Sequence, residues 1–201
     1  GQIVPWNFPL MFTSWKLGPA LAAGNTVVMK PSELTPLSTL RIAELALEVG
    51  FPPGVLNVVP GYGHTAGARI ADHPDIGKIS FTGSTATGRS IVKASAGNLK
   101  KLQLELGGKG PNIVFEDANI PMAVGGSAFA IFHNQGQACI AGSRLMLHES
   151  IADAFLEKFI GLAKSIRLGD PLSADTEMGP LTSKMHLDRV LAYCDVAVEQ
   201  G

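Results

Sequence analysis

Cysteine is scarce in this sequence, whose 201 residues include only Cys139 and Cys194. Two cysteines cannot form the disulfide framework of a small secreted domain, which favours a reducing compartment, and we expect a cytoplasmic protein. The five histidines are scattered, without the His/Cys spacing of a metal site. We therefore expect no metal.

Charged residues are also few, 16% of the chain against the roughly 25% typical of globular domains. The formal net charge is −1, so the chain lacks the basic footprint of a nucleic-acid-binding protein and has no charge attraction to an acidic membrane surface. No run of about 18 apolar residues is present, and no transmembrane helix is predicted. A surface so poor in charge indicates that other protein covers part of it.

Apolar residues are abundant instead. They make up 46% of the chain, enough to form a core and to exclude a disordered protein. The sequence starts on Gly1 rather than Met and ends directly after an expected helix over residues 185–198. We interpret it as a fragment of a longer protein.

Short apolar strands alternate with amphipathic helices along the chain. Strands are expected at residues 26–29, 55–59, 76–81, 101–106, 112–115 and 145–148, and helices at 36–49, 85–96, 121–132 and 151–166. Such alternation predicts βαβ units and a parallel sheet. We therefore predict a doubly wound, Rossmann-like α/β cofactor domain over residues 1–107. Residues 108–201 are predicted to form the first part of a second α/β domain.

Cys139 lies in an unusual setting. It follows the apolar run 123–132, in the turn 134–139 (Asn-Gln-Gly-Gln-Ala-Cys). A cysteine that only fills a core usually lies in an apolar periodic pattern, whereas glycine lets the backbone approach a ligand closely. The turn suits a nucleophile, but a buried structural thiol is an equal alternative until partner residues are found.

Two turns join an expected strand to an expected helix and are candidates for binding phosphate. The turn 61–67 has three residues before its third glycine, whereas the dinucleotide-binding fingerprint has two. The turn that contains Gly83 and Ser84 is the better candidate, because the exposed amides at a helix N-terminus favour an anion. The alternative is that Ser84 only caps the helix.

Polar residues also follow expected strands at their carboxyl ends, where open α/β sheets bind ligands. Glu33, close to Lys30, could bind ribose hydroxyls and repel a 2′-phosphate, which favours NAD over NADP; the alternative is a solvated ion pair. Glu105 ends the strand 101–106, where partial desolvation would suit a general base. Its alternative role is an ion pair with Lys109.

Two further residues have two interpretations each. Asn7 lies between two prolines, so its amide is held rigidly and could donate to an oxyanion, or it caps the helix that follows. Cys194 lies with Val190, Leu191 and Val198 at helical spacing, and we interpret it as a core residue.

Five stretches in this order resemble the NAD(P)-dependent aldehyde dehydrogenase superfamily. They are residues 5–9 (Pro-Trp-Asn-Phe-Pro), 30–33 (Lys-Pro-Ser-Glu), 81–85 (Phe-Thr-Gly-Ser-Thr), 105–109 (Glu-Leu-Gly-Gly-Lys) and 134–139. Each motif is weak alone, but the five together extend the resemblance along essentially the whole chain. The resemblance implies a protein longer than this chain that forms a homodimer or homotetramer.

The resemblance implies NAD-dependent oxidation of a small-molecule aldehyde to a carboxylic acid. Cys139 would attack the aldehyde, and the Asn7 side-chain amide and the Cys139 backbone N–H would hold the oxyanion of the thiohemiacetal. After hydride loss, Glu105 would activate the water that releases the acid from the thioester. Lys16 matches a position proposed as a proton relay in some members.

The resemblance also implies the cofactor contacts. Trp6 and Ser84, with Gly83 in the same turn, would contact the pyrophosphate, and Lys30 and Glu33 would contact the adenosine ribose. NAD is the expected cofactor, with NADP possible. The family's Glu-x-Phe-Gly-Pro stretch, which grips the nicotinamide ribose, does not occur in this sequence. We therefore expect no dehydrogenase turnover from these 201 residues alone.

Two other functions stay open. A CoA-acylating dehydrogenase would pass the acyl group of the thioester to coenzyme A, but such members generally lack a glutamate at the position of Glu105. A non-catalytic binding or structural protein on the same fold is the other possibility, and the presence of Cys139, Glu105 and Asn7 argues against it. The residues that flank Cys139 are too generic to identify the aldehyde.

Overall fold

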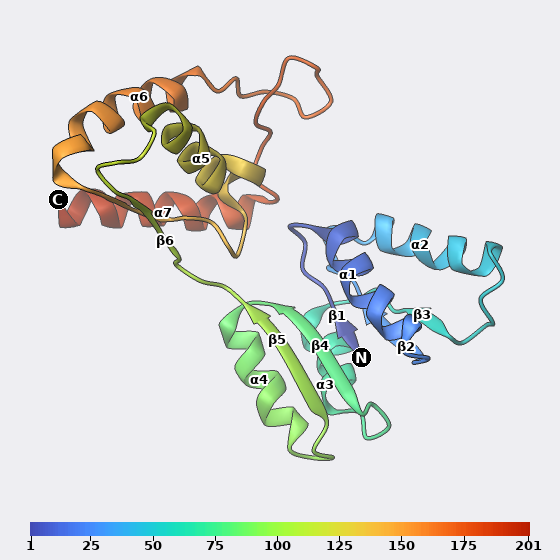
Figure 1. Ribbon diagram of the computed structural model, residues 1–201. Helices are drawn as coiled ribbons and strands as arrows, with labels where there is room; N and C mark the ends of the chain where they lie inside the picture. Colours follow the sequence, from blue (N-terminus) through green and yellow to red (C-terminus); the bar gives the residue numbers. More distant parts are fainter. The chain divides into compact units, whose positions relative to one another are not determined.

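Strands and helices alternate within two α/β units, Gly1–Gly107 and Gly108–Gly201, in a computed structural model that describes residues 1–201 (Figure 1). Each unit contains a parallel sheet, as the alternation of strands and helices predicts. None of the helices has the length and apolar character needed to cross a bilayer.

The first unit is built on a five-stranded parallel sheet with the strand order β3-β2-β1-β4-β5. The strands are β1 (Gln2–Ile3), β2 (Val27–Lys30), β3 (Leu56–Val58), β4 (Lys78–Gly83) and β5 (Lys101–Leu106). The order reverses between β1 and β4, and open α/β sheets bind ligands at the carboxyl end of such a reversal. The Rossmann-like prediction is confirmed for this unit.

Helices cover both faces of this sheet. The helices are α1 (Pro9–Ala22), α2 (Leu37–Glu48), α3 (Ala68–Asp72), which follows a single π-helical turn, and α4 (Thr85–Ser95). Phe12 and Leu17 of α1 pack with Met29 of β2 in one core cluster. Ile70 of α3 and Ile91 of α4 belong to a second cluster, on the other face. The unit is therefore doubly wound.

Strand β5 shows strict alternation of apolar and polar side chains. Leu102, Leu104 and Leu106 pack against the core cluster that contains α3 and α4. The intervening Gln103 and Glu105 lie on the opposite face and are exposed. Successive side chains of a strand point to opposite faces, so β5 has one buried face and one polar face.

The second unit has a two-stranded parallel sheet, β6 (Pro111–Val114) and β7 (Arg144–Leu147). Its helices are α5 (Ile120–Phe132), α6 (Ala152–Ser165) and α7 (Lys184–Gln200). Val114, Val124 and Phe155 form its core, and Phe155 is fully buried. The core therefore joins β6, α5 and α6.

The interpretation of Cys194 as a core residue is wrong. Helix α7, which carries it, has no buried residue, and the Cys194 side chain is exposed. Its apolar spacing is real, since Val190, Leu191 and Val198 share the helix, but all three are exposed as well. Periodicity identifies an apolar face and does not show that the face is covered.

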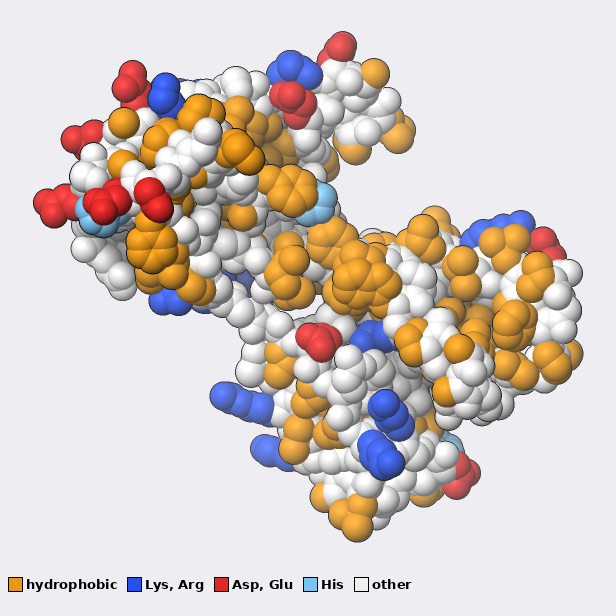
Figure 2. Space-filling model, viewed as in Figure 1, with side chains coloured by type: hydrophobic (Ala, Val, Ile, Leu, Met, Phe, Trp, Pro, Cys, Tyr) orange, Lys and Arg blue, Asp and Glu red, His pale blue; other side chains and the backbone are white.

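Large hydrophobic side chains are also exposed on the first unit. Figure 2 shows them spread over the surface of α1 and α2. Trp15 of α1 and Leu37 and Leu47 of α2 are among them. Their number agrees with the low share of charged residues in the sequence.

Candidate active site

The loops that follow β1, β2 and β3 are joined by hydrogen bonds at the carboxyl edge of the sheet. The Thr35 hydroxyl donates to the Trp6 carbonyl at 3.3 Å, which joins the loop after β2 to the loop after β1. The Lys30 ammonium donates to the carbonyl of Gly61 at 2.9 Å, in the loop after β3. This edge is therefore an ordered set of loops beside the reversal of strand order.

Lys30 is 3% exposed, so the alternative of a solvated ion pair is wrong for this lysine. Besides Gly61, its ammonium donates to the Pro31 carbonyl at 2.7 Å and to Glu33 Oε2 at 3.4 Å. An ammonium has three protons, and here each has an acceptor. The Glu33 side chain is 43% exposed. It is the member of the pair that offers its carboxylate to solvent.

Helix α4 begins at the turn after β4. The Ser84 hydroxyl accepts a hydrogen bond from the Thr87 backbone N–H at 3.2 Å, so Ser84 is the N-cap. Ser84 therefore caps the helix, and the N-terminal end of an 11-residue helix lies at this edge. Gly83 is required by packing, because a Cβ there would lie 2.5 Å from the Phe81 ring.

Asn7 precedes α1, but the helix does not have it as its N-cap. The cap position is Phe8, no side chain caps the helix, and Pro9 opens it. Proline is favoured at a first helical position because its fixed φ suits the helix and its missing N–H is not needed there. The amide of Asn7 is thus placed by the rigid Pro-Trp-Asn-Phe-Pro stretch, directly before the helix.

The expected desolvation of Glu105 is not observed. Glu105 lies on the polar face of β5 and is exposed. The apolar neighbours in the sequence, Leu104 and Leu106, point to the other face of the sheet. A hydrophobic strand sequence therefore does not bury every residue in it, because side chains alternate between faces.

A chain of hydrogen bonds leads from α1 to Glu105. The Lys16 ammonium donates to the Ser80 hydroxyl at 2.9 Å. Ser80 donates to Gln103 Oε1, and Gln103 Nε2 lies 3.4 Å from Glu105 Oε1. Burial lowers the pKa of Lys16 to about 8, and the negative charge of Glu105 opposes part of this shift.

In the second unit, Cys139 follows a backbone segment of rare conformation. Asn134 and Gln135 have φ values of 51° and 58°, and Gly136 follows with a φ of 71°. The left-handed region costs a non-glycine residue roughly 1–2 kcal/mol. Such conformations persist only where surrounding contacts impose them, and they concentrate at functional sites.

Gln137 supplies the contacts that hold this segment. Its side-chain Nε2 donates to the Asn134 carbonyl at 3.2 Å and to Gln135 Oε1 at 2.9 Å. Its Oε1 accepts the backbone N–H of Thr182 at 3.0 Å, from a residue 45 positions away. Gln137 is 9% exposed. Its amide therefore connects the left-handed residues to a distant loop of the same unit.

Cys139 lies at the tip of the next turn. The Ala141 N–H donates to the Ala138 carbonyl at 3.2 Å and closes the turn over Cys139 and Ile140. The thiol is free and half-buried. The turn does not use the Cys139 backbone N–H, because its closing bond runs from Ala141 to Ala138. A thiol and an N–H on the same residue are thus both available.

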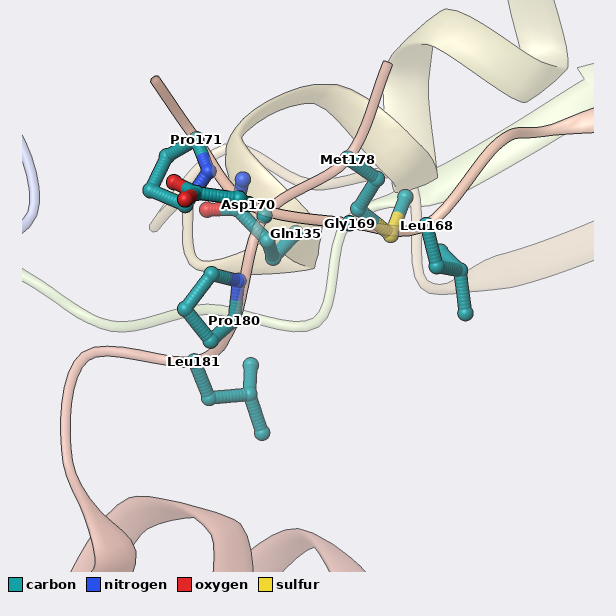
Figure 3. Close-up of a pocket in the computed structure, with 9 residues that line it drawn as sticks. Gln135, Leu168, Gly169, Asp170, Pro171, Met178, Pro180 and Leu181 are labelled. Carbon is teal, nitrogen blue, oxygen red and sulfur yellow. The ribbon is translucent and has the colours of Figure 1, made fainter. Parts of the chain in front are cut away.

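A pocket of about 470 Å³ lies beside this segment. Figure 3 shows that Gln135 contributes to it and that its other lining residues belong to the 168–181 segment, among them Leu168, Met178 and Pro180. The pocket is mostly apolar. The left-handed Gln135 therefore lines a pocket that is otherwise formed by this loop.

Comparison with known proteins identifies the family. The aldehyde dehydrogenase family model matches the whole chain, residues 1–201. The chain belongs to this family. The aldehyde dehydrogenase of Davidiella tassiana is 54% identical over all of the chain, which covers 41% of that protein. The mitochondrial aldehyde dehydrogenase of Homo sapiens is 52% identical, again over the whole chain and over 39% of its own length.

Solved structures of similar sequence have the same fold. A putative aldehyde dehydrogenase from Burkholderia cenocepacia is 78% identical with a TM-score of 0.99, and PnpE in complex with nicotinamide adenine dinucleotide is 77% identical with a TM-score of 0.98. The chain is covered completely in both comparisons and covers 41% of each structure. It thus spans about 40% of the length of these two proteins.

The sequence did not reveal three residues of these networks. Ser80 and Gln103 each lie between two apolar residues of a strand, and this alternation could have placed both on the polar face of the sheet. Gln137 is an amide in a turn, and its role depends on Thr182, far along the sequence. No local pattern could have indicated that contact.

Proposed function

We propose that this chain carries the nucleophile, the base and the adenosine-side cofactor contacts of an NAD-dependent aldehyde dehydrogenase that produces a carboxylic acid. Membership of the family supports oxidation of an aldehyde. The observation that carries the assignment of the nucleophile is the turn at Cys139, where Gln137 holds left-handed backbone and both the thiol and the N–H of the cysteine are available.

The chemistry follows from the functional groups. The Cys139 thiolate adds to the aldehyde carbon; a C–S bond forms and the carbonyl electrons move to oxygen. The Cys139 backbone N–H and the Asn7 side-chain amide donate to this oxyanion. Bound NAD supplies the acceptor for the hydride that the same carbon then loses, and a thioester results.

Glu105 completes the reaction as a general base. It takes a proton from water, whose oxygen adds to the thioester carbonyl; the C–S bond then breaks and the thiolate leaves. Exposure on the polar face of β5 gives this carboxylate access to water. The products are the carboxylic acid and the regenerated cysteine.

The residues at the carboxyl edge of the first sheet fit a dinucleotide. The N-terminal end of α4, with Gly83 and Ser84, offers backbone N–H groups to the pyrophosphate. Trp6 is proposed as a further pyrophosphate contact, as the family resemblance implies. The exposed Glu33 carboxylate suits ribose hydroxyls, and the buried Lys30 holds it. A 2′-phosphate next to Glu33 would be repelled, so we propose a preference for NAD. Comparable kcat/KM values with NADP would contradict it.

Assembly and location are proposed from the family resemblance. We expect the protein of full family length to be a homodimer or homotetramer that acts on a small-molecule aldehyde. We expect it in the cytoplasm, although relatives of similar identity from Homo sapiens and Rattus norvegicus are named as mitochondrial enzymes.

The chain's two cysteines allow a matched test of the nucleophile. In a protein of family length that carries this sequence, Cys139→Ser should reduce aldehyde-dependent NADH formation by roughly a thousandfold or more, because a serine hydroxyl is a far weaker nucleophile than a thiolate. Cys194→Ser, which changes an exposed thiol, should retain activity.

Alkylation gives the complementary measurement. Iodoacetamide should abolish activity in the wild type and in Cys194→Ser, with one adduct on the peptide that contains Cys139. Activity that survives complete alkylation of Cys139 would refute its assignment as the nucleophile.

A further inference from the structure

The polar faces of β4 and β5 carry a continuous set of side-chain hydrogen bonds. Ser80 and Gln103 occupy paired positions of the two strands, and Glu105 is two residues further along β5 on the same face. Lys16 reaches Ser80 from α1. Lys16 and Ser80 are each 8% exposed, whereas Gln103 and Glu105 are exposed. The hydrogen bonds therefore run from a buried ammonium to an exposed carboxylate.

The chemistry of Lys16 fixes the direction of every bond in this set. A protonated lysine only donates, so the Ser80 oxygen must accept from it. The single hydroxyl proton of Ser80 then goes to Gln103, which must present its carbonyl oxygen Oε1. The amide nitrogen of Gln103 is left facing Glu105 Oε1 at 3.4 Å. The reversed amide would place its carbonyl oxygen against the carboxylate.

We propose that Ser80 and Gln103 are positioning residues for Glu105. Because Lys16 can only donate, the bonds through Ser80 orient the Gln103 amide so that its N–H group faces the Glu105 carboxylate. The inference rests on the proposed function, in which Glu105 activates water. An N–H donor favours the ionised form of a carboxylate, and only the ionised form can accept a proton. The bond also restricts the rotamer of an otherwise exposed side chain.

The other charged groups near this face are few. Lys78 and Lys101 lie on the same faces of β4 and β5, at the opposite end of the strands from Glu105. Asp75 lines, with Lys16, Ser80 and Gln103, a groove of about 720 Å³. From β1, the neutral Gln2 donates to the Lys16 carbonyl. The terminal amino group of Gly1, directly before β1, lines the groove and donates to the Lys78 carbonyl at 2.8 Å. Lys16 is thus the one cation joined to Glu105 by this set of bonds.

The test uses a protein of family length that carries this sequence. Gln103→Met keeps the length of the side chain and removes both hydrogen bonds, at an exposed position where folding is not at risk. Ser80→Ala removes the link to Lys16. For both variants we expect release of the acid from the thioester to slow roughly three- to tenfold, the effect of losing one hydrogen bond of ordinary strength. The acidic limb of the pH profile of kcat should move to higher pH.

Two measurements separate a positioning role from general damage. Mass spectrometry after an acid quench gives the fraction of Cys139 held as thioester in steady state, and this fraction should rise in both variants. The double variant should be no slower than Gln103→Met alone, because one set of bonds is lost only once. Ser80→Thr, which retains the hydroxyl, should restore the wild-type profile. Lys101→Met is the control on the same strand face and should behave as wild type.

Glu105→Gln distinguishes the inference from the function on which it rests. If Glu105→Gln leaves acid release unchanged, the proposed base is wrong. If Glu105→Gln blocks acid release while Gln103→Met and Ser80→Ala leave the thioester fraction and the pH profile unchanged, the positioning role is overturned and the base stands.

Discussion

Lys16 carries an ammonium into a largely buried place where its side-chain partner is the neutral hydroxyl of Ser80. A buried cation that is hydrogen-bonded only to an uncharged group loses its hydration energy and does not recover it through an ion pair. The lowered pKa of about 8 expresses this cost, which Glu105 reduces through space. Protonated Lys16 therefore destabilises the folded state. In the same form it donates to Ser80 and so sets the orientation of the hydrogen bonds that lead to Glu105.

The stability of the protein should depend on pH through Lys16. Between the folded pKa of about 8 and the ordinary value of 10.5, the unfolded chain retains a proton that the folded chain has lost. The unfolded state then binds more protons, so the free energy of unfolding rises with pH across this window. The penalty is complete below pH 8 and absent above pH 10.5.

Lys16→Met removes this dependence. We expect Lys16→Met to have a higher free energy of unfolding than wild type at about pH 7. Urea denaturation should show this difference to be smaller by roughly 2 kcal/mol at about pH 10. Lys93→Met, at an exposed position of α4, should show no such change. If the free energies of unfolding of Lys16→Met and wild type differ by the same amount at both pH values, burial of the Lys16 ammonium does not carry the assigned cost.

At the scale of the element, the segment before Cys139 is the part of the chain whose conformation is least favoured locally. Helix α5 ends at Phe132, and the left-handed residues 134–136 then reverse the direction of the backbone. The backbone N–H of Gly142 bonds to the carbonyl of Ala130 at 3.0 Å and brings the chain back beside the helix. Gly136 is the only glycine among the left-handed residues of this segment, and it lies close to the end of α5.

Gly136→Ala should destabilise the protein by roughly 1–2 kcal/mol or more, because alanine is strained at positive φ. Its Cβ would also lie 3.0 Å from the Ile131 carbonyl oxygen. Gly125→Ala is the matched control: Gly125 is an exposed residue within α5, and the added methyl would meet nothing within 4 Å. This control should stabilise the protein by roughly 0.5–1 kcal/mol.

The two variants add the same methyl group to the same unit, so their opposite signs isolate the effect of the backbone conformation. Thermal or urea denaturation of both variants measures the difference in the free energy of unfolding. A Gly136→Ala variant as stable as wild type would show that the left-handed segment is not required as described.

At the scale of the whole molecule, the chain holds the residues proposed for chemistry in two units, with Asn7 and Glu105 in the first and Cys139 in the second. The apolar side chains of α7 are exposed, and so are several on α1 and α2. Full-length relatives have more than twice as much chain, since this one covers about 40% of them. Activity is therefore proposed for a protein of family length.

The 201-residue chain alone should not oxidise aldehydes at a measurable rate. It lacks the Glu-x-Phe-Gly-Pro stretch that the family resemblance assigns to the nicotinamide ribose. Absorbance at the NADH band, followed with an aldehyde, NAD and the purified chain, should stay flat, while a protein of family length gives turnover. NADH formation by the isolated chain, lost on Cys139→Ser, would contradict this expectation.

The sequence by itself determined the class of fold and the position of nearly every element. Strand β5 occupies residues 101–106 as predicted, and α5 and α6 differ from their predicted bounds by one residue at each end or less. Alternating strands and helices are local patterns of hydrophobicity, and hydrophobicity is a property of the sequence. Cys139, Glu105 and Ser84 could also be identified as candidate site residues from the sequence, because each lies in a short motif of neighbouring residues.

Tertiary structure alone decided which side chains are covered and which are joined. It exposed Glu105 and Cys194, buried Lys30, and linked Gln137 to Thr182 and Lys16 to Ser80. Burial and hydrogen bonding depend on what packs against a residue, often from a distant part of the chain. A periodic pattern shows which face of an element is apolar, and only the packed fold shows whether that face meets protein or water.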